Sequence, residues 1–232
     1  MKSLEHEFRS VLDEALAVLF PIECSGCSRP DTALCDQCVA AIPLELQNWG
    51  DTPPIIAATS YTGVARAAVL DLKEHGRTSL AAHLAPLLQE ALYKLVTILN
   101  RRHGAALAEY TSCIELVVPP QTPAAKRRRG YHPVEELLKP LGYRNTRVLK
   151  LVSVPEDQRA LSATERSHNM QNRFAVTENL TGRAFITVDD VMTTGATLNE
   201  LGRVIQQAGG WHLGSAVLCH TPRKIEQFLP TR

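Results

Sequence analysis

Residues 185–200, FITVDDVMTTGATLNE, place two adjacent carboxylates between an apolar run and a turn rich in hydroxyl groups. The apolar residues 184–188 predict a buried strand. Asp189 and Asp190 follow at its carboxyl end, where we expect strand pairing to stop and both side chains to turn toward a crevice. Ligands of open α/β sheets bind at such strand ends, so the two carboxylates predict a binding site.

The turn that follows the two aspartates has the composition of an anion site. Its members are Thr193, Thr194, Gly195, Ala196 and Thr197. Backbone N–H groups, hydroxyls and the start of a helix suit a phosphate group. Two carboxylates do not suit a phosphate, but they accept hydrogen bonds from the vicinal hydroxyls of a ribose or hold a divalent cation. The stretch as a whole predicts a site for a ribose 5-phosphate group.

Other phosphate sites fit this sequence less well. The chain contains no G-x-x-x-x-G-K-[ST] loop, and no G-x-G-x-x-G follows a predicted strand, which argues against a Walker loop and a dinucleotide fold. The remaining alternative is that the aspartates only cap a helix and that the loop is an ordinary turn.

Four of the six cysteines lie within fifteen residues, in the spacing C-x2-C-x7-C-x2-C. Cys24, Cys27, Cys35 and Cys38 would present two pairs of thiolates from two tight turns, as a structural Zn²⁺ prefers. A disulfide pair, an iron–sulfur cluster and coincidence are the alternatives. Four protein ligands leave no open position on the metal, so we expect this ion to hold structure and not to activate water. The residues around the cysteines include one arginine, two aspartates and no aromatic residue, which disfavours a nucleic-acid knuckle.

The order of predicted elements indicates an α/β protein. Strands are predicted at 55–61, 115–119, 147–152, 184–188 and 213–219, and helices at 64–72, 78–100, 134–141 and 198–208. Strand, helix and strand between 184 and 219 form a βαβ unit, which predicts a mainly parallel sheet with helices on both faces. Residues 120–133 are predicted to be a loop rich in Pro and Arg.

A small module precedes this domain. Apolar residues at helical spacing between 4 and 19 predict a short amphipathic helix, which leads into the cysteine cluster. Residues 39–54 contain Pro43, Gly50, Pro53 and Pro54, and we interpret them as a linker. The predicted division is therefore an N-terminal helix and zinc module over 1–45 and an α/β domain over 46–232.

Composition excludes several classes of protein. The 25 Lys+Arg and 24 Asp+Glu residues give a net charge of +1, so no global field directs the chain to nucleic acid or membrane. No apolar run approaches the roughly 20 residues of a membrane helix, and the first residues carry acids, unlike a signal peptide. We therefore expect a cytoplasmic protein without membrane insertion.

Taken with these motifs, VDDVMTTGAT resembles the phosphoribosyl pyrophosphate (PRPP) signature of type I phosphoribosyltransferases. The resemblance narrows when the rest of the chain is included. The four-cysteine knuckle, the strand end VVPPQTPAAKRRRGYHP and the pattern Q-x2-L-x4-R-x2-N at 158–169 precede that signature. This order is similar to the ComF family of competence-associated proteins. Where relatives read V-P-V-P, this chain has Val118, Pro119 and Pro120, and His132 replaces Asn or Asp.

The resemblance implies a type I phosphoribosyltransferase-like fold and a PRPP site. Asp189 and Asp190 would hold the ribose hydroxyls, and residues 193–197 would hold the 5-phosphate. Pyrophosphate must be held by cations, and the candidates are Lys73, Arg127, Arg129 and the backbone at Gly130, together with Mg²⁺. For the sequence KRRRG, a solvated basic loop and a contact with DNA phosphates are the alternatives.

The polar segment 153–173 shows no sustained period. It is either a lid or a surface excursion. Under the resemblance, Gln158, Arg166 and Asn169 belong to a lid that covers bound PRPP and keeps water from the reactive centre.

Two functions remain open from the sequence. The first is a phosphoribosyltransferase that transfers the phosphoribosyl group to an unidentified acceptor. The second is a PRPP-sensing or single-stranded-DNA-binding adaptor, which resembles the ComF role in DNA uptake with a helicase-like ATPase. A third possibility, a degenerate scaffold, is weak because both acids and the threonine–glycine loop are present.

Overall fold

The computed structural model describes residues 22–104, 107, 114–152 and 173–222. Its centre is a five-stranded sheet in the order β1-β2-β7-β6-β3. The strands are β1 (Gln47–Asp51), β2 (Pro54–Ser60), β3 (Glu115–Val117), β6 (Ala184–Met192) and β7 (Trp211–His220). The pairs β2–β7, β7–β6 and β6–β3 are parallel, and only β1 runs antiparallel to its neighbour. The predicted mainly parallel sheet is confirmed.

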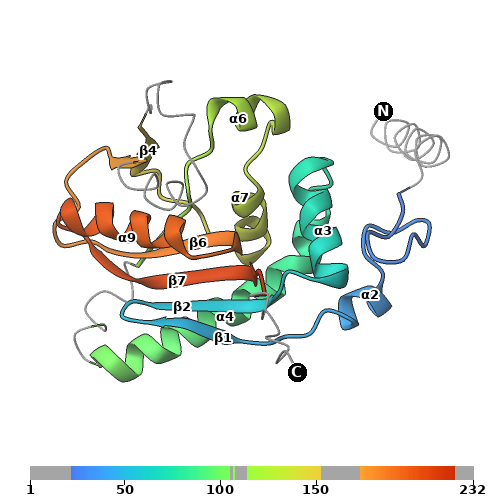
Figure 1. The fold of residues 1–232 in the computed structure, drawn as a ribbon, viewed down its shortest axis with the longest axis horizontal. Helices are drawn as coiled ribbons and strands as arrows, with labels where there is room; N and C mark the ends of the chain where they lie inside the picture. Colours follow the sequence, from blue (N-terminus) through green and yellow to red (C-terminus); the bar gives the residue numbers. More distant parts are fainter. Residues whose placement is uncertain (1–21, 105–106, 108–113, 153–172, 223–232) are drawn as a thin grey trace, which may run out of the picture.

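Helices cover both faces of this sheet (Figure 1). They are α3 (Gly63–Glu74), α4 (Leu80–His103), α7 (Pro133–Leu138) and α9 (Ala196–Gln207). Alternate residues of β2 divide between the two faces: Ile56 and Ala58 pack in the cluster that contains α3, α4 and α7, whereas Ile55 and Ala57 pack with Leu198 of α9. Burial on both faces explains why the central strands are continuous apolar runs.

Most of the predicted elements are confirmed. The strands predicted at 55–61, 184–188 and 213–219 correspond to β2, β6 and β7. The predicted helices correspond to α3, α4, α7 and α9, and a 3-10 turn, η1 (Lys139–Leu141), continues α7. The strand predicted at 147–152 is β4 (Leu149–Leu151), which pairs with β5 (Phe174–Val176) in a separate two-stranded sheet.

The predicted loop over 120–133 is wrong in its centre, because Pro123–Arg129 form helix α6. The hydroxyl of Thr122 accepts a hydrogen bond from the backbone N–H of Ala125 at 3.1 Å. Pro123 occupies the first turn, and Gly130 ends the helix in the left-handed region with φ 75°. These end signals define a helix that has no apolar face, so hydrophobic periodicity did not indicate it.

The predicted linker also contains regular structure. Residues 36–40 form helix α2 (Asp36–Ala40), and residues 47–51 form β1, the edge strand that pairs with β2. The side chains of β1 are exposed or half-buried, so its sequence lacks the apolar alternation by which a strand is recognised. The domain boundary near residue 46 remains a prediction, and the predicted helix over 4–19 lies outside the described residues.

Within the described part of the chain, no helix combines the length and the apolar character needed to cross a bilayer.

A cluster of three buried polar side chains lies between β6, β7 and α9. Thr187 Oγ1 lies 2.7 Å from Ser215 Oγ and 3.2 Å from Nε2 of His212. Gly202 of α9 leaves room for the imidazole, because a Cβ at this position would lie 2.4 Å from Nδ1 of His212. Burial lowers the pKa of His212 to about 4, so the ring is neutral in the folded protein at neutral pH.

We predict that acid destabilises the protein through His212. Its folded pKa of about 4 lies below the ordinary value of 6.5, so the unfolded state takes up a proton first as the pH falls. The stability contributed by the neutral ring is complete above about pH 6.5 and is lost toward pH 4, by roughly 3 kcal/mol in total. Urea unfolding between pH 7 and 4.5 measures the slope.

The matched variants for this measurement are His212→Gln and His83→Gln, since His83 is only half-buried. The His212→Gln protein should lose this part of the pH slope, and His83→Gln should keep it. Equal slopes in the wild type and both variants would contradict the assignment.

Candidate functional site

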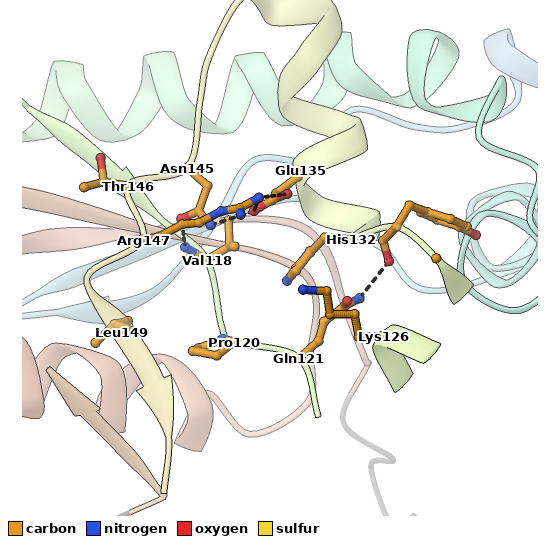
Figure 2. A pocket seen from close by; sticks show the side chains of 12 residues that line it. Val118, Pro120, Gln121, Lys126, His132, Glu135, Asn145, Thr146, Arg147 and Leu149 are labelled. Atoms are coloured by element: carbon orange, nitrogen blue, oxygen red, sulfur yellow. Dashed lines mark hydrogen bonds and ion pairs between the residues drawn. The ribbon is translucent and has the colours of Figure 1, made fainter. Parts of the chain in front are cut away.

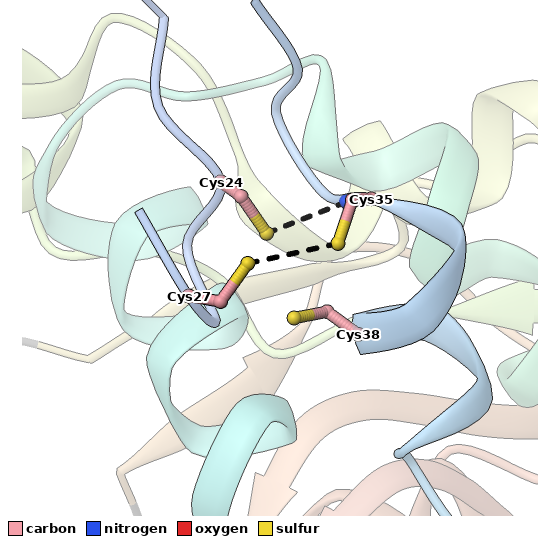
Figure 3. A group of neighbouring side chains, drawn as sticks. All are labelled: Cys24, Cys27, Cys35 and Cys38. Carbon is pink, nitrogen blue, oxygen red and sulfur yellow. Dashed lines mark hydrogen bonds between the residues drawn. The ribbon is translucent and has the colours of Figure 1, made fainter. Parts of the chain in front are cut away.

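The four predicted zinc ligands lie together (Figure 3). Their sulfur atoms are all within 4.8 Å of one another, and the sulfurs of Cys27 and Cys35 are 3.7 Å apart. A tetrahedral Zn²⁺ with bonds of about 2.3 Å places its sulfur ligands about 3.8 Å from one another. The four cysteines therefore fit a structural zinc ion. The sulfur separation is too long for a disulfide bond between Cys27 and Cys35.

The backbone around the cluster favours thiolates. Gly26 and Cys35 donate their N–H groups to the sulfur of Cys24 at 3.4 and 3.3 Å. Burial opposes ionisation, but these backbone donors lower the pKa of Cys24 to about 6. Burial and the neighbouring thiols raise the pKa of Cys38 to about 12. The chain thus stabilises one thiolate by itself, and a divalent cation would supply the charge that allows the others to ionise.

The prediction that strand pairing stops before Asp189 and Asp190 is wrong. Strand β6 continues to Met192, and Val191 and Met192 still pair with β7. Neighbouring residues of a strand point to opposite faces. Asp190 is buried on the side of α3, whereas Asp189 is half-buried and accepts a hydrogen bond from the backbone N–H of Asp190 at 2.8 Å. Strand β6 extends beyond the two aspartates because its partner β7 continues to His220 and provides residues for Val191 and Met192 to pair with.

Lys73, from the last turn of α3, reaches Asp190. Its Nζ lies 2.8 Å from Oδ1 of Asp190, whose side chain is only 6% exposed. Burial opposes the charge of Lys73, but Asp190 raises its pKa above the ordinary value. Burial and repulsion by Asp190 raise the pKa of Asp189 well above its ordinary range. The site therefore holds one ion pair and, next to it, a second acid whose charged form is disfavoured.

The predicted phosphate loop connects β6 to α9. Gly195 is the N-cap of α9 and has φ 78°, a left-handed conformation that favours glycine. The backbone N–H of Ala196 donates to the hydroxyl of Thr194 at 3.3 Å, and Thr193 and Thr194 are exposed. The loop thus presents exposed hydroxyl-bearing side chains at the start of a helix of 12 residues.

A cavity of about 330 Å³ lies next to this loop, on the side of the β1–β2 hairpin. Thr193, Thr194 and Asn199 line it together with Trp49 and residues 50–53. This hairpin was not predicted to have a role, because residues 39–54 were interpreted as a linker. No local sequence signal identifies the hairpin as part of the site, because it lies near the loop only when β2, β7 and β6 pair in the sheet.

The predicted pyrophosphate residues come from α3 and α6, which meet at their C-terminal ends. Glu74 binds Arg128 at 2.8 Å and Arg129 at 2.6 Å, next to Lys73 in the sequence. The hydroxyl of Tyr131 also donates to the carbonyl of Leu72. Glu74 was not predicted from the sequence, where it stands as an ordinary helix acid.

The structure therefore brings Lys73, Arg129 and Gly130 to one corner of the molecule. Arg127 does not join them: it is exposed and forms no ion pair within the described residues. Arg129 is mostly buried, with 15% of its side chain exposed, and its charge is compensated by Glu74. An anion that binds here must share these cations with Glu74 and Asp190.

A second cavity, of about 300 Å³, is lined by residues of α6, of α7 and of the segment 145–149 (Figure 2). Glu135, Asn145 and Arg147 lie together on one side of it, and Gln121, Lys126 and His132 on the other. Asn145 donates to Glu135 at 2.8 Å and accepts from the backbone N–H of Val118 at 3.1 Å. His132 contacts the carbonyl of Pro119 at 2.9 Å. Glu135 and Asn145 were not predicted as site residues, because they lie in segments without a recognisable binding motif.

The predicted lid residues Gln158, Arg166 and Asn169 lie outside the described residues. Strands β4 and β5, which flank this segment in the sequence, pair antiparallel near α9.

We predict that replacing one cysteine of the cluster releases the metal. Cys35→Ser should lower the zinc content of protein purified with reduced thiols from about one equivalent to near zero, because three thiolates hold the ion much more weakly. Atomic emission spectroscopy measures the metal. Cys219→Ala is the control, since Cys219 lies outside the cluster. Less than one equivalent of zinc in the wild type would refute the assignment.

Comparison with known proteins shows similarity to phosphoribosyltransferase-type and competence proteins. Residues 127–228 match the family described as "Phosphoribosyl transferase domain". The chain is 29% identical over 213 residues to "DNA utilization protein YhgH" of Salmonella typhimurium, which covers 85% of this chain and 90% of the relative. It is 32% identical over 130 residues to "Competence protein F" of Haemophilus influenzae, covering 53% of this chain and 55% of the relative.

A third relative, "Competence protein ComFC" of Streptococcus pneumoniae, is 29% identical over 98 residues, which cover 41% of this chain and 43% of the relative. The relatives, the matched domain, the parallel sheet and the four-cysteine cluster agree in one assignment. The chain is similar to the ComF-type competence proteins and carries a phosphoribosyltransferase-type domain over residues 127–228.

Proposed function

We propose that the protein binds PRPP at the junction of β6 and α9 and transfers its phosphoribosyl group to an acceptor with release of pyrophosphate. The observation that carries this proposal is the ion pair between Lys73 and the buried Asp190, beside a loop whose sequence resembles the PRPP signature. Asp189 and Asp190 bind the ribose hydroxyls, and residues 193–197 bind the 5-phosphate.

The pyrophosphate group binds at the corner where α3 and α6 meet. Lys73, Arg129 and the backbone at Gly130 contact it, whereas Arg127, which is exposed outside this corner, does not. Mg²⁺ bound with PRPP neutralises part of the diphosphate charge. In the free protein Lys73 and Asp190 compensate each other. The anionic ligand attracts Lys73, which leaves the carboxylate of Asp190 available to a ribose hydroxyl.

This arrangement suits the charge changes of the reaction. As pyrophosphate leaves the anomeric carbon, positive charge develops on the ribose and negative charge on the leaving group. The carboxylate of Asp190 near the ribose and the cations around the diphosphate stabilise both charges, and preorganised charge is usually the largest contribution to catalysis. Gln158, Arg166 and Asn169, in the segment between β4 and β5, would close over the ligand and exclude water.

The alternative function is an adaptor that binds PRPP without turnover. The names of the relatives refer to DNA utilization and competence, which supports a role connected with DNA. Such an adaptor would act with incoming single-stranded DNA and a helicase-like ATPase. Lys126, Arg127 and Arg128 are exposed on α6 and can contact DNA phosphates. Either function belongs in the cytoplasm, where thiols stay reduced and can hold zinc.

We predict that removing both carboxylates weakens PRPP binding. In the double variant Asp189→Asn and Asp190→Asn, the affinity for PRPP with Mg²⁺ should fall about 30-fold, because hydrogen bonds to charged groups contribute roughly 2 kcal/mol. Calorimetric titration measures the affinity. Glu90→Gln, on the exposed side of α4, is the control for a lost acid and should bind as the wild type does. Unchanged affinity in the double variant would refute the ribose assignment.

Turnover distinguishes the two functions. We expect pyrophosphate release from PRPP that depends on an added acceptor, measured with candidate nucleobases and with single-stranded DNA, and loss of this release in Asp190→Asn. Binding of PRPP without release under any acceptor would favour the adaptor. The adaptor also requires DNA binding that weakens with salt and with Arg127→Ala and Arg128→Ala.

A further inference from the structure

The last turn of α3 is held from two opposite sides. Asp71 faces the cysteine module, whereas Lys73 faces β6 and contacts Asp190. Residues two positions apart in an α-helix are separated by about 200° around its axis, so the side chains of Asp71 and Lys73 leave opposite sides of the same turn. The cysteine module lies directly beside this helix (Figure 1). The same turn therefore joins the module to the proposed PRPP site.

Arg77 is the centre of the contact with the cysteine module. Its Nη1 donates to Oδ2 of Asp71 at 2.7 Å and to Oγ of Ser25 at 2.8 Å. The hydroxyl of Ser25 in turn donates to Asp71 at 2.7 Å. Gly76, with φ 72°, allows the chain to reverse after α3 so that Arg77 returns beneath the helix end. The three side chains form a closed triangle, which we call the Arg77 clamp.

The Arg77 clamp also holds the backbone next to two of the cysteines. Nη2 of Arg77 donates to the carbonyl of Glu23, which precedes Cys24, and to the carbonyl of Ala33 at 3.4 Å. Cys24 and Cys35 are buried. One guanidinium thus links both arms of the cysteine module to α3, and its planar donors suit several acceptors at once.

Packing supports the same contact at the other end of the helix. A Cβ at Gly26 would lie 3.1 Å from Cγ1 of Val64 and 2.6 Å from the sulfur of Cys38. The module and the first turn of α3 are therefore closely packed. The module therefore contacts both ends of α3.

We infer that the Arg77 clamp positions Lys73 against Asp190, so that the ordered cysteine module supports PRPP binding from a distance. This inference rests on the proposed function, because it takes Lys73 to be a ligand-binding residue. Arg77 itself is a positioning residue: its contacts are with Asp71, Ser25 and the module. When the clamp is broken, the last turn of α3 frays and Lys73 loses its fixed approach to the site.

The first experiment needs no ligand. Hydrogen–deuterium exchange of the amides between 69 and 75 is measured in zinc-loaded wild type, Arg77→Ala and Arg66→Ala. Arg66 is exposed on α3 and makes no ion pair among the described residues, so its variant controls for the lost charge. Exchange should become at least about tenfold faster in Arg77→Ala and after zinc is removed by a chelator, and stay unchanged in Arg66→Ala. Unchanged exchange in Arg77→Ala overturns the inference.

The second experiment tests whether the effect passes through Lys73. PRPP affinity is measured by calorimetry in the single variants Arg77→Ala and Lys73→Met and in the double variant. The affinity should fall about tenfold in Arg77→Ala, and the double variant should be no weaker than Lys73→Met alone. Additive losses, or full affinity in Arg77→Ala, overturn the inference. If Arg77→Ala does not fold, Ser25→Ala replaces it, because this change removes the two hydrogen bonds of the Ser25 hydroxyl and leaves the guanidinium paired with Asp71.

The two experiments separate failure of the inference from failure of the proposed function. If the wild type does not bind PRPP, the proposed function fails, and the exchange measurement still decides whether the Arg77 clamp holds α3. If the wild type binds PRPP and the exchange does not respond to Arg77→Ala, the proposed function stands and the inference fails.

Discussion

The ion pair between Lys73 and Asp190 is the contact on which the arrangement of the site depends. It joins the end of α3 to β6 across the face of the sheet, with a distance of 2.8 Å between charged atoms. A buried carboxylate without a partner is costly, and removing one member of such a pair destabilises a protein strongly. The position of α3 relative to the sheet is therefore fixed by the same two charges that the proposed reaction requires.

Other elements are arranged around this contact. Glu74, the residue after Lys73, binds the end of α6 through Arg128 and Arg129. On the opposite side of α3, the Arg77 clamp binds the cysteine module. Helix α3 is thus a link between three parts of the chain that carry the sequence motifs. This explains how a four-cysteine module without an open metal position can contribute to a site that contains no cysteine.

The sequence predicted the elements whose residues are buried on both faces or on one regular face. Strands β2, β6 and β7 are apolar runs, and α9 has the spacing of an amphipathic helix, so local pattern and tertiary environment agree. Strand β1 and helix α6 were missed because neither buries an apolar face. The true end of β6 was missed because it depends on how far β7 continues, which is a property of the neighbouring strand.

The same distinction applies to the candidate site. The cysteine cluster and the β6–α9 loop were recognised because short spacing encodes them, and the structure brings the four sulfurs together. Glu74, Asn145, Glu135 and Arg77 could not be recognised, since each acquires its partner from a segment far away in the sequence. Lys73 was named as a pyrophosphate ligand, but its contact with Asp190 required the fold.

The central claim is that the β6–α9 junction binds PRPP. Backbone amide resonances of isotope-labelled, zinc-loaded protein, recorded during titration with PRPP and Mg²⁺, test this claim most directly. We expect saturable shifts concentrated at residues 189–197 and around Lys73 and Gly130, with little change on the far end of α4. No shifts, or shifts confined to residues remote from this junction, would contradict it.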